Sequence, residues 1–376
     1  MYLKYTLSLK GYGGDIVEEN LILAINPGST STKIALYNGQ ECIKVENLIH
    51  SKDSLKGFEE IYHQKDMRSE VILDWLKVQD IDMGRLKAIV GRGGLLRPMS
   101  GGTYVVTEAM IEDLKIGYQG QHASNLGGII AYDIAKKLNI PAYIVDPVAV
   151  DEFLEEARLS GLPEIKRRSL VHALNIKATA RKICDKINMD FKEASFIVVH
   201  LGGGISIAPV FRGRILDVNN ANEGGPLSPE RAGDVPAGAL VRLCFSGRYT
   251  QGEIKKKLTR EGGLLGYLGT NDAREIVARI EKGDEEAELI FKAMAYQISK
   301  EIAAMATVLK GKVDRIIITG GLAYGKLLMS WIEERVSFIA EVEVVPGENE
   351  MESLAMGALR VLIGEEEAKI YEDEVL

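Results

Sequence analysis

The chain has 376 residues, 46% of them hydrophobic, and a formal net charge of −8. This length and apolar share suit two domains, each with its own core. The negative charge argues against a nucleic-acid partner, because neutralising phosphates requires Lys and Arg concentrated on one face. No apolar run approaches the roughly 20 residues that a bilayer requires, and no secretory signal is recognisable, so we expect a soluble, cytoplasmic protein without a membrane partner.

The cysteines and the two chain ends carry no sign of a site. Cys42, Cys184 and Cys244 are far apart and odd in number, which predicts buried thiols and neither a disulfide framework nor a thiolate metal site. We expect residues 1–20 to form a loosely attached extension. The acidic tail 364–376 is expected to fray.

Three strand-like runs open the folded part of the chain, and turn residues separate them, which predicts a meander. Strand and helix then alternate, which predicts a mostly parallel sheet covered by helices. The expected strands are 21–26, 33–38, 42–49, 88–91 and 142–146, and the expected helices are 57–78, 108–114 and 123–138.

The second half repeats the opening pattern of three strands followed by helices, so the chain looks internally duplicated. Two such halves facing each other would make a cleft. The expected strands are 196–202, 205–211, 214–220, 315–321 and 341–346, and the expected helices are 172–187, 236–246, 251–258, 272–282, 284–309 and 351–362.

The stretch Ile25–Gly39, with the sequence INPGSTSTKIALYNG, suggests a phosphate-binding P-loop. A P-loop has glycine where this chain has Thr32 and continues into a helix, whereas Lys33 opens a strand. The stretch is therefore a turn between strands that can bind phosphate through backbone amides and through Ser29 and Ser31. A matching turn in the second half consists of Gly202, Gly203 and Gly204. Either turn alone would be interpreted as an ordinary hairpin, but the repetition favours two phosphate-binding turns.

Longer motifs carry a resemblance that covers residues 21–364. The chain contains AINPGSTSTK, GRGGLLRPMSGGTY, DPVAVDEF, HLGGGIS, NEGGPLSPERAGDVP, ITGG and ENEMESLAMGAL. It resembles the butyrate kinase branch of the acetate kinase family, within the superfamily of acetate and sugar kinases, heat-shock chaperone ATPases and actin. The resemblance implies an α/β fold of two duplicated ribonuclease H-like domains, of the βββαβαβα type, enclosing a nucleotide-binding cleft.

We expect the first domain to comprise residues 1–165 with 353–376 and the second to comprise 166–352. A short hinge is expected near 161–166, because no Pro- or Ser-rich linker separates the halves. The resemblance also implies at least a homodimer.

The implied reaction is the reversible phosphorylation of butyrate by ATP, with Mg²⁺, to butyryl phosphate and ADP. An anion attacks an anion, so the site must supply positive charge and in-line alignment. Arg92 matches the substrate-binding arginine of the family, with Arg97 as the alternative. Arg231 matches the arginine that stabilises the transferring phosphoryl group. Arg92 or Arg97 could instead form a surface ion pair, and Arg231 could be a solvated loop residue.

Other site residues follow from the same resemblance. Asp146 closes a strand at the edge where open α/β folds place their sites, and it matches an aspartate near the metal and γ-phosphate. It could alternatively cap a helix. His172 matches a residue that contacts the phosphoryl group, and His122 matches one near the acyl group, although isolated histidines are commonly structural. We expect His200 to pack within the sheet edge.

Asn26 matches a residue near the metal and phosphates, and Glu352 matches the magnesium-associated glutamate. Glu350 is close enough to be confused with it, and Mg²⁺ prefers few carboxylates plus water, so an indirect role is equally consistent. The expected metal residues are Glu352, Asp146 and Asn26. Gly320 and Gly321 resemble the adenosine motif.

The sequence departs from acetate kinase at two positions, Gly203 and Ile176, where that family has asparagine and histidine. The acyl chain stays open between butyrate, isobutyrate and propionate, because a hydrophobic pocket discriminates one methylene by only about 10–200-fold. A chaperone-like or actin-like ATPase would not need Arg92. A sensor that has lost catalysis would not need Arg231.

Overall fold

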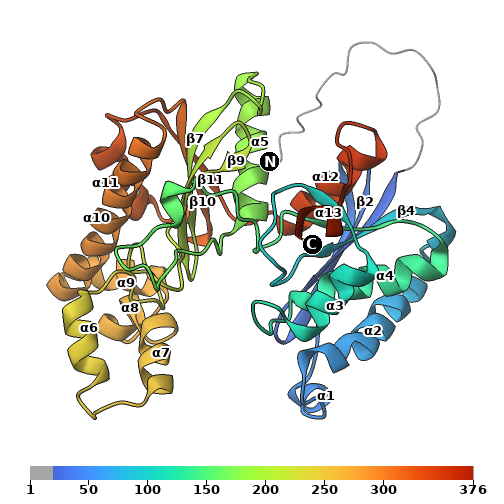
Figure 1. Cartoon of the computed structure of the whole chain (residues 1–376), viewed down its shortest axis with the longest axis horizontal. Coiled ribbons are helices and arrows are strands. Elements are labelled where there is room, and N and C mark those ends of the chain that lie inside the picture. Colours follow the sequence, from blue (N-terminus) through green and yellow to red (C-terminus); the bar gives the residue numbers. More distant parts are fainter. Residues whose placement is uncertain (1–19, 376) are drawn as a thin grey trace.

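The structure, a computed structural model, describes residues 20–375 as two lobes, each built on one β-sheet (Figure 1). Our expectation for the N-terminal extension therefore concerns residues that, apart from Asn20, lie outside the described part. The first sheet has the order β12-β5-β6-β4-β1-β2-β3 and the second β11-β10-β7-β8-β9. The strands of the first sheet are β1 (Leu21–Pro27), β2 (Ser31–Asn38), β3 (Glu41–Ile49), β4 (Leu86–Arg92), β5 (Thr103–Val105), β6 (Ala142–Val145) and β12 (Lys369–Ile370). Those of the second are β7 (Ser195–Leu201), β8 (Ile205–Phe211), β9 (Arg214–Ile215), β10 (Arg315–Gly320) and β11 (Val342–Pro346).

The pairing confirms the α/β fold and the predicted duplication. β1 pairs antiparallel with β2 and parallel with β4, and β7 pairs antiparallel with β8 and parallel with β10. In both lobes the central strand therefore lies between a hairpin partner and a parallel crossover partner. The turns that follow β1 and β7 occupy equivalent places.

Alternating side chains of the central strands feed two cores in each lobe, because successive residues of a strand point to opposite faces. In the first lobe Leu23 and Ile25 pack toward α2 and α4, while Ile22 and Ala24 pack toward α12. The helical segments of this lobe are α1 (Lys52–Leu55), η1 (Ile61–Gln64), α2 (Lys65–Val78), η2 (Met83–Arg85), α3 (Glu108–Ile116), α4 (Asn125–Leu138), α12 (Glu350–Leu362) and α13 (Glu372–Val375).

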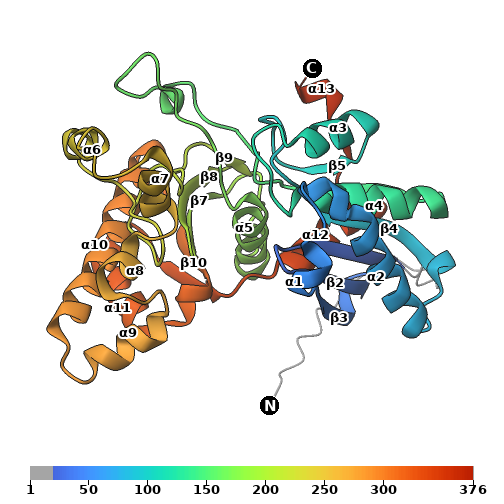
Figure 2. The same ribbon diagram turned by 90° about the horizontal axis from the view of Figure 1, so that it is seen from below.

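In the second lobe Phe196 and Val198 pack toward α5, whereas Ile197 and Val199 pack toward α10 and α11. Figure 2 shows α5 and α12 side by side between the two sheets. The helical segments outside the first lobe are η3 (Glu156–Arg158), α5 (Ala173–Ile187), α6 (Ala237–Cys244), α7 (Gln251–Thr259), α8 (Gly263–Leu268), α9 (Ala273–Ile280), α10 (Glu285–Val308), η4 (Gly321–Tyr324) and α11 (Lys326–Val336). None of the helices within residues 20–375 combines the length and apolarity needed to span a membrane.

Two predicted elements were too long. The helix expected over 57–78 begins at Lys65, after the separate 3₁₀ turn η1. The strand expected over 214–220 ends at Ile215, because the Asn219 side chain takes over the bonding to β8. Its Oδ1 accepts from the Ile207 amide at 2.7 Å and its Nδ2 donates to the Ile205 carbonyl at 2.8 Å.

The expectation that the acidic tail frays is wrong. β12 adds to the first sheet beside β5, and Tyr371 is fully buried. The Tyr371 hydroxyl donates to Asp113 Oδ2 at 2.8 Å and accepts from the Arg97 amide at 3.2 Å. The expectation of buried thiols holds only for Cys184, since Cys42 and Cys244 are exposed.

The chain crosses between the lobes earlier than the hinge expected near 161–166. Val150 and Phe153 already pack in the core beneath the second sheet, and the Leu154 amide donates to the Leu216 carbonyl at 3.0 Å. The return crossing lies between the end of β11 and the start of α12. We therefore propose boundaries near Val150 and Gly347 in place of 165 and 352, with α12 and the tail returning to the first lobe.

Candidate active site

Arg92 and Asn26 meet at the carboxyl edge of the first sheet, because β4 and β1 run parallel. Arg92 Nη1 lies 2.5 Å from Glu350 Oε1 and 3.4 Å from Asn26 Oδ1. Asn26 Nδ2 donates to Glu350 Oε2 at 2.5 Å. Glu350, at the start of α12, thus presents a carboxylate to the arginine that the sequence assigned to substrate binding.

The alternative arginine, Arg97, has a different position. Its Nε lies 2.7 Å from Asp113 Oδ2, and its guanidinium covers the Tyr118 ring at 4.6 Å from the centroid. These contacts tie Arg97 to α3 and the C-terminal tail. Arg92 is therefore the one of the two that lies beside Asn26.

Two histidines form a stacked pair at the facing edge of the second lobe. The rings of His172 and His200 are 4.0 Å apart between centroids and inclined by 15°. His172 Nδ1 lies 2.9 Å from Ser206 Oγ, and His200 Nδ1 lies 2.8 Å from Asn175 Oδ1. His200 is almost wholly buried on β7, as the sequence predicted, but it also takes part in this polar cluster.

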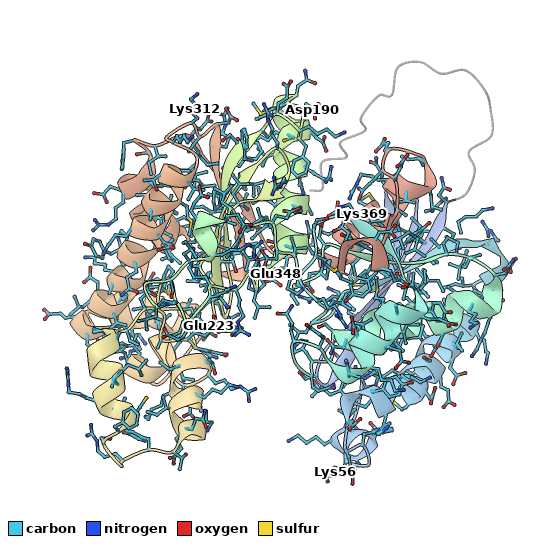
Figure 3. The ribbon with its side chains drawn as sticks, viewed as in Figure 1. Lys56, Asp190, Glu223, Lys312, Glu348 and Lys369 are labelled. Carbon is cyan, nitrogen blue, oxygen red and sulfur yellow. The ribbon has the colours of Figure 1, made fainter. Side chains whose placement is uncertain are left out.

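Glu348 extends the cluster between the two lobes (Figure 3). Its Oε1 lies 3.2 Å from His200 Nε2, and that hydrogen bond holds the pKa of Glu348 below its ordinary value. Glu348 and Glu350 thus reach the second-lobe histidine and the first-lobe arginine respectively. The connector between β11 and α12 contributes Glu348 to one side of the site, and the first residue of α12 contributes Glu350 to the other.

Arg231 packs against the glycine turn that follows β7. A Cβ added to Gly204 would lie 2.3 Å from Arg231 Nη1, so the guanidinium occupies space that only glycine leaves free. The loop is held by Ser228, whose hydroxyl donates to the Gly203 carbonyl at 2.7 Å and accepts from the Arg231 amide at 3.1 Å. Burial lowers the pKa of Arg231, although its guanidinium stays charged near neutral pH.

Arg92 and His172 come from opposite lobes and line the same small cavity. Arg231 packs on Gly204, two residues before Ser206, which contacts His172. Burial holds the pKa of His172 well below its usual range, and the charges of His200, Arg92 and Arg231 lower it further. Three of the residues that the resemblance assigned to the chemistry therefore lie in one region of the molecule.

Asp146 lies just beyond β6 in a strained conformation. Its φ is 38°, in the left-handed region that non-glycine residues rarely adopt and that costs on the order of 1–3 kcal/mol. Oδ1 accepts from the Gly102 amide at 2.8 Å, so the aspartate caps this loop instead of a helix. Burial raises the pKa of Asp146, against the opposing charge of Lys177. A small cavity lined by Asp146, Arg92 and His172 joins it to the cluster.

Three of the five nucleotide-binding glycines predicted in the second lobe line a cavity of about 1160 Å³, which is large enough for a nucleotide. Gly202 and Gly203 lie on its wall, as do Gly321 and the segment 271–274. Gly320 has a φ of 94°, and a Cβ there would lie 2.4 Å from the Leu201 carbonyl. Glycine thus lets the end of β10 approach β7 beside this cavity.

The residues of the first turn lie at the edge already occupied by Asn26. Ser29 and Ser31 follow Asn26 within five residues, and the Lys33 side chain on β2 is exposed. His122 is exposed at the N-terminal side of α4, where its Nδ1 lies 2.8 Å from Ser124 Oγ. Desolvation lowers the pKa of His122, and so does the charge of Arg92.

The three residues expected to bind the metal differ in their contacts and in the cavities that they line. Asn26 contacts Glu350, whereas Glu352 is exposed and lines a different cavity of about 530 Å³ between α5 and α12. Asp146 borders both this cavity and the one beside Arg92. Within residues 20–375 no three His, Cys, Asp or Glu side chains cluster as a metal site. Mg²⁺ is commonly held by one or two carboxylates, substrate phosphates and water, so Asp146 and Glu350 remain adequate donors.

Several residues of the site were missed from the sequence. Ser206, Asn175 and Glu348 complete the histidine cluster, and Arg68 with His50 supports the first turn. Most of them come from segments distant in the chain, so neither spacing nor periodicity signals their contact. A buried position for Arg68 could have been suspected, because α2 has apolar residues four and eight positions later.

Comparison with known proteins gives a consistent result. The profile described as Acetokinase family matches residues 164–355. Acetate kinase from Porphyromonas gingivalis superposes with a TM-score of 0.76 at 21% identity, covering 91% of this chain and 100% of the other. Acetate kinase from Entamoeba histolytica has a TM-score of 0.71 at 18% identity, and the covered shares are 90% and 98%. A propionate kinase from Francisella tularensis has a TM-score of 0.70 at 19% identity, with the same coverage of 90% and 98%.

Proposed function

Since the chain belongs to the acetokinase family, we propose that it phosphorylates butyrate with ATP and releases butyryl phosphate and ADP. Family membership supports a phosphotransferase with a carboxylate acceptor. The choice of butyrate rests on the sequence motifs that resemble the butyrate kinase branch. The likeness to the solved acetate and propionate kinases supports the fold alone.

The carboxylate is proposed to bind Arg92, where the guanidinium already holds the Glu350 carboxylate. Two parallel N–H donors suit a carboxylate in this geometry. Butyrate would displace Glu350 from this position, and His122 lies within range of the same charge. The acyl chain would then extend toward the apolar lining beside Arg92, which includes Val148, Pro147 and Leu174.

ATP is proposed to bind in the cavity of about 1160 Å³. Its adenosine would lie near Gly320 and Gly321, and its phosphates would extend past Gly202–Gly204 toward the first turn. Asn26, Ser29, Ser31 and Lys33 would contact the terminal phosphate from the opposite lobe. Bare amides and hydroxyls suit this role, because they approach phosphate oxygens closely.

In the proposed transfer a carboxylate oxygen attacks the γ-phosphorus while the bond from that phosphorus to the β-phosphate oxygen breaks. The electron pair leaves with ADP, and no proton is transferred. Arg231 would stabilise the charge on the equatorial oxygens, and neutral His172 would donate a hydrogen bond from its Nε2. A bound Mg²⁺ would neutralise phosphate charge, with Asp146, Asn26 and Glu350 or Glu352 near it.

The observation that carries this proposal is that Arg92 of the first lobe and His172 of the second line one cavity, with Arg231 packed on the glycine turn that follows β7. An ATPase switch of the chaperone or actin type would not require an arginine next to a carboxylate at this edge. A related kinase for isobutyrate or propionate would use the same site, since an apolar acyl pocket distinguishes these acids only by the volume of their acyl chains.

Hydroxylamine traps acyl phosphates, so incubation with ATP, Mg²⁺, butyrate and hydroxylamine tests the proposal. We expect hydroxamate formation that depends on butyrate, with acetate, propionate and isobutyrate as parallel arms. A higher kcat/KM for another of these acids would make that acid the preferred substrate in place of butyrate. ADP release that is independent of any carboxylate would overturn the kinase. Arg92→Ala should raise KM for the acid more than KM for ATP, because it removes a carboxylate contact.

A further inference from the structure

Arg68 is a fully buried arginine on α2 that binds the turn between β1 and β2. Its Nη1 donates to the Gly28 carbonyl at 2.9 Å and to the Ser31 carbonyl at 3.0 Å, and its Nη2 donates to the Ser29 carbonyl at 3.3 Å. Gln64, one helical turn earlier, accepts from Nε and Nη2 at 3.2 and 2.8 Å. The guanidinium is therefore locked in place under the turn.

His50 completes the support from β3. Its backbone amide donates to the Thr30 carbonyl at 2.8 Å, and its Nε2 lies 2.8 Å from Thr32 Oγ1. Arg68 Nη1 donates to the same hydroxyl at 3.0 Å, which leaves the hydroxyl proton to point at the imidazole. Burial and the charge of Arg68 lower the pKa of His50, in agreement with a neutral ring that accepts this proton.

The direction of these bonds decides where the turn's amides point. Every peptide bond in the part of the chain that the structure describes is trans. In a trans peptide the carbonyl and the following N–H point in opposite directions. The carbonyls of Gly28 and Ser29 face Arg68, so the N–H groups of Ser29 and Thr30 face away from it. The Thr30 carbonyl faces the His50 amide, so the Ser31 N–H faces away from β3.

The charge of Arg68 is not balanced nearby. Over residues 20–375 no carboxylate lies within ion-pairing distance of its guanidinium, whose donors are used on carbonyl, hydroxyl and amide oxygens. A cation behind the carbonyls aligns with the peptide dipoles and increases the positive potential on their N–H side. The outer face of the turn therefore favours an anion.

We propose that Arg68 is a positioning residue for phosphate binding, which holds the Gly28–Ser31 turn so that its amides face the terminal phosphates of ATP. This role rests on the proposed function, because it assumes that the turn binds the nucleotide's phosphates. Arg68 itself does not touch the substrate; it acts through the backbone. Nothing in the spacing of the sequence links it to the turn, which lies 37 to 40 residues away.

The test measures ligand affinity and fold stability separately in Arg68→Met, Arg68→Lys and wild type. We expect Arg68→Met to weaken the binding of ATP and of inorganic tripolyphosphate by about 10–100-fold, the range for losing an outer support of a ligand site. KM for butyrate should stay within about twofold. Arg68→Lys keeps the positive charge but loses the planar guanidinium with its several donors, so it should recover part of the affinity for ATP and tripolyphosphate.

Ile72→Ala is the matched control, since Ile72 is fully buried on the same helix and faces the core. It should lower the melting temperature while leaving ATP affinity unchanged. Gln64→Ala, which frees the guanidinium without removing it, gives a milder variant should Arg68→Met not fold, and it should also weaken tripolyphosphate binding.

Two results separate the role of Arg68 from the proposed function. If wild type is stabilised by ATP and the Arg68 and Gln64 variants are stabilised equally, Arg68 has no positioning role and the kinase proposal stands. If wild type itself binds neither ATP nor tripolyphosphate, the proposed function fails at its phosphate site.

Discussion

Arg92 Nη1 and Glu350 Oε1 are 2.5 Å apart, at the place where we propose that a substrate carboxylate binds. Glu350 is therefore both a neighbour of the catalytic groups and a competitor for the arginine. Butyrate binding requires the Glu350 carboxylate to move, and a nearby divalent cation would favour that movement by attracting it.

The two candidate glutamates can be separated by paired substitutions. We expect Glu350→Gln to lower kcat at least tenfold and to raise the Mg²⁺ concentration required for half-maximal rate, because only Glu350 contacts Asn26 and Arg92. Glu352→Gln, on the exposed side of α12, should change either quantity by less than about threefold. Titrations of rate against Mg²⁺ measure both. If Glu352→Gln had the larger effect on both quantities, Glu352 would be the metal-associated glutamate.

Arg231→Ala should act mainly on turnover. Because the guanidinium is proposed to meet charge that develops in the transition state, we expect kcat to fall by about 10²–10³-fold, with a smaller change in KM for ATP. Gly204→Ala offers an independent variant, since its Cβ would collide with Arg231 Nη1 and displace it. Steady-state kinetics of both variants check this. Unchanged kcat in either one, with the fold intact, would remove Arg231 from the chemistry.

Acid should destabilise the protein through His172. Burial keeps the folded pKa of His172 well below the ordinary 6.5, so the unfolded chain binds the extra proton first. Stability from the neutral ring is therefore complete above pH 6.5 and decreases as the pH falls below that value. We expect His172→Asn to flatten the decline of melting temperature between pH 6.5 and 5. The exposed His63 provides the control, and an equal effect of His63→Asn would contradict the assignment.

The C-terminal tail should contribute measurably to the stability of the first lobe. Tyr371→Phe removes a buried hydroxyl from Asp113 and from the Arg97 amide, and we expect a loss of about 1–3 kcal/mol. Tyr267→Phe, at an exposed ring, should cost much less. Urea unfolding of both variants measures the free energies. Equal values would mean that the Tyr371 hydroxyl adds nothing to the attachment of the tail.

Much of the fold could be predicted, because the long central strands are continuous apolar runs bounded by turn residues. β1 and β7 were recognised in this way, and so was their equivalence. β5 and β12 could not be recognised, since strands of two or three residues have no period to detect. The sequence placed the crossing between the lobes later than we now propose, because an exposed loop and a hinge carry the same glycine signals.

The site was predictable to the extent that strand ends collect residues at one edge. Asp146 was placed by that rule, whereas Asn26 and Arg92, which also end strands, were assigned by the resemblance to the acetate kinase family. The contacts of Glu348 with His200 and of Arg68 with the first turn could not be foreseen, because each joins segments far apart in the chain. Such contacts depend on the packing of whole helices, which local propensity does not encode.

The return of α12 and β12 to the first lobe has a consequence for folding. Every strand of the second sheet precedes Gly347, so that sheet has all its strands in a chain cut after Pro346. The lobe whose strands come first along the chain then lacks α12 and β12. A fragment that ends at Pro346 would therefore protect its second lobe from protease and leave its first lobe open to cleavage.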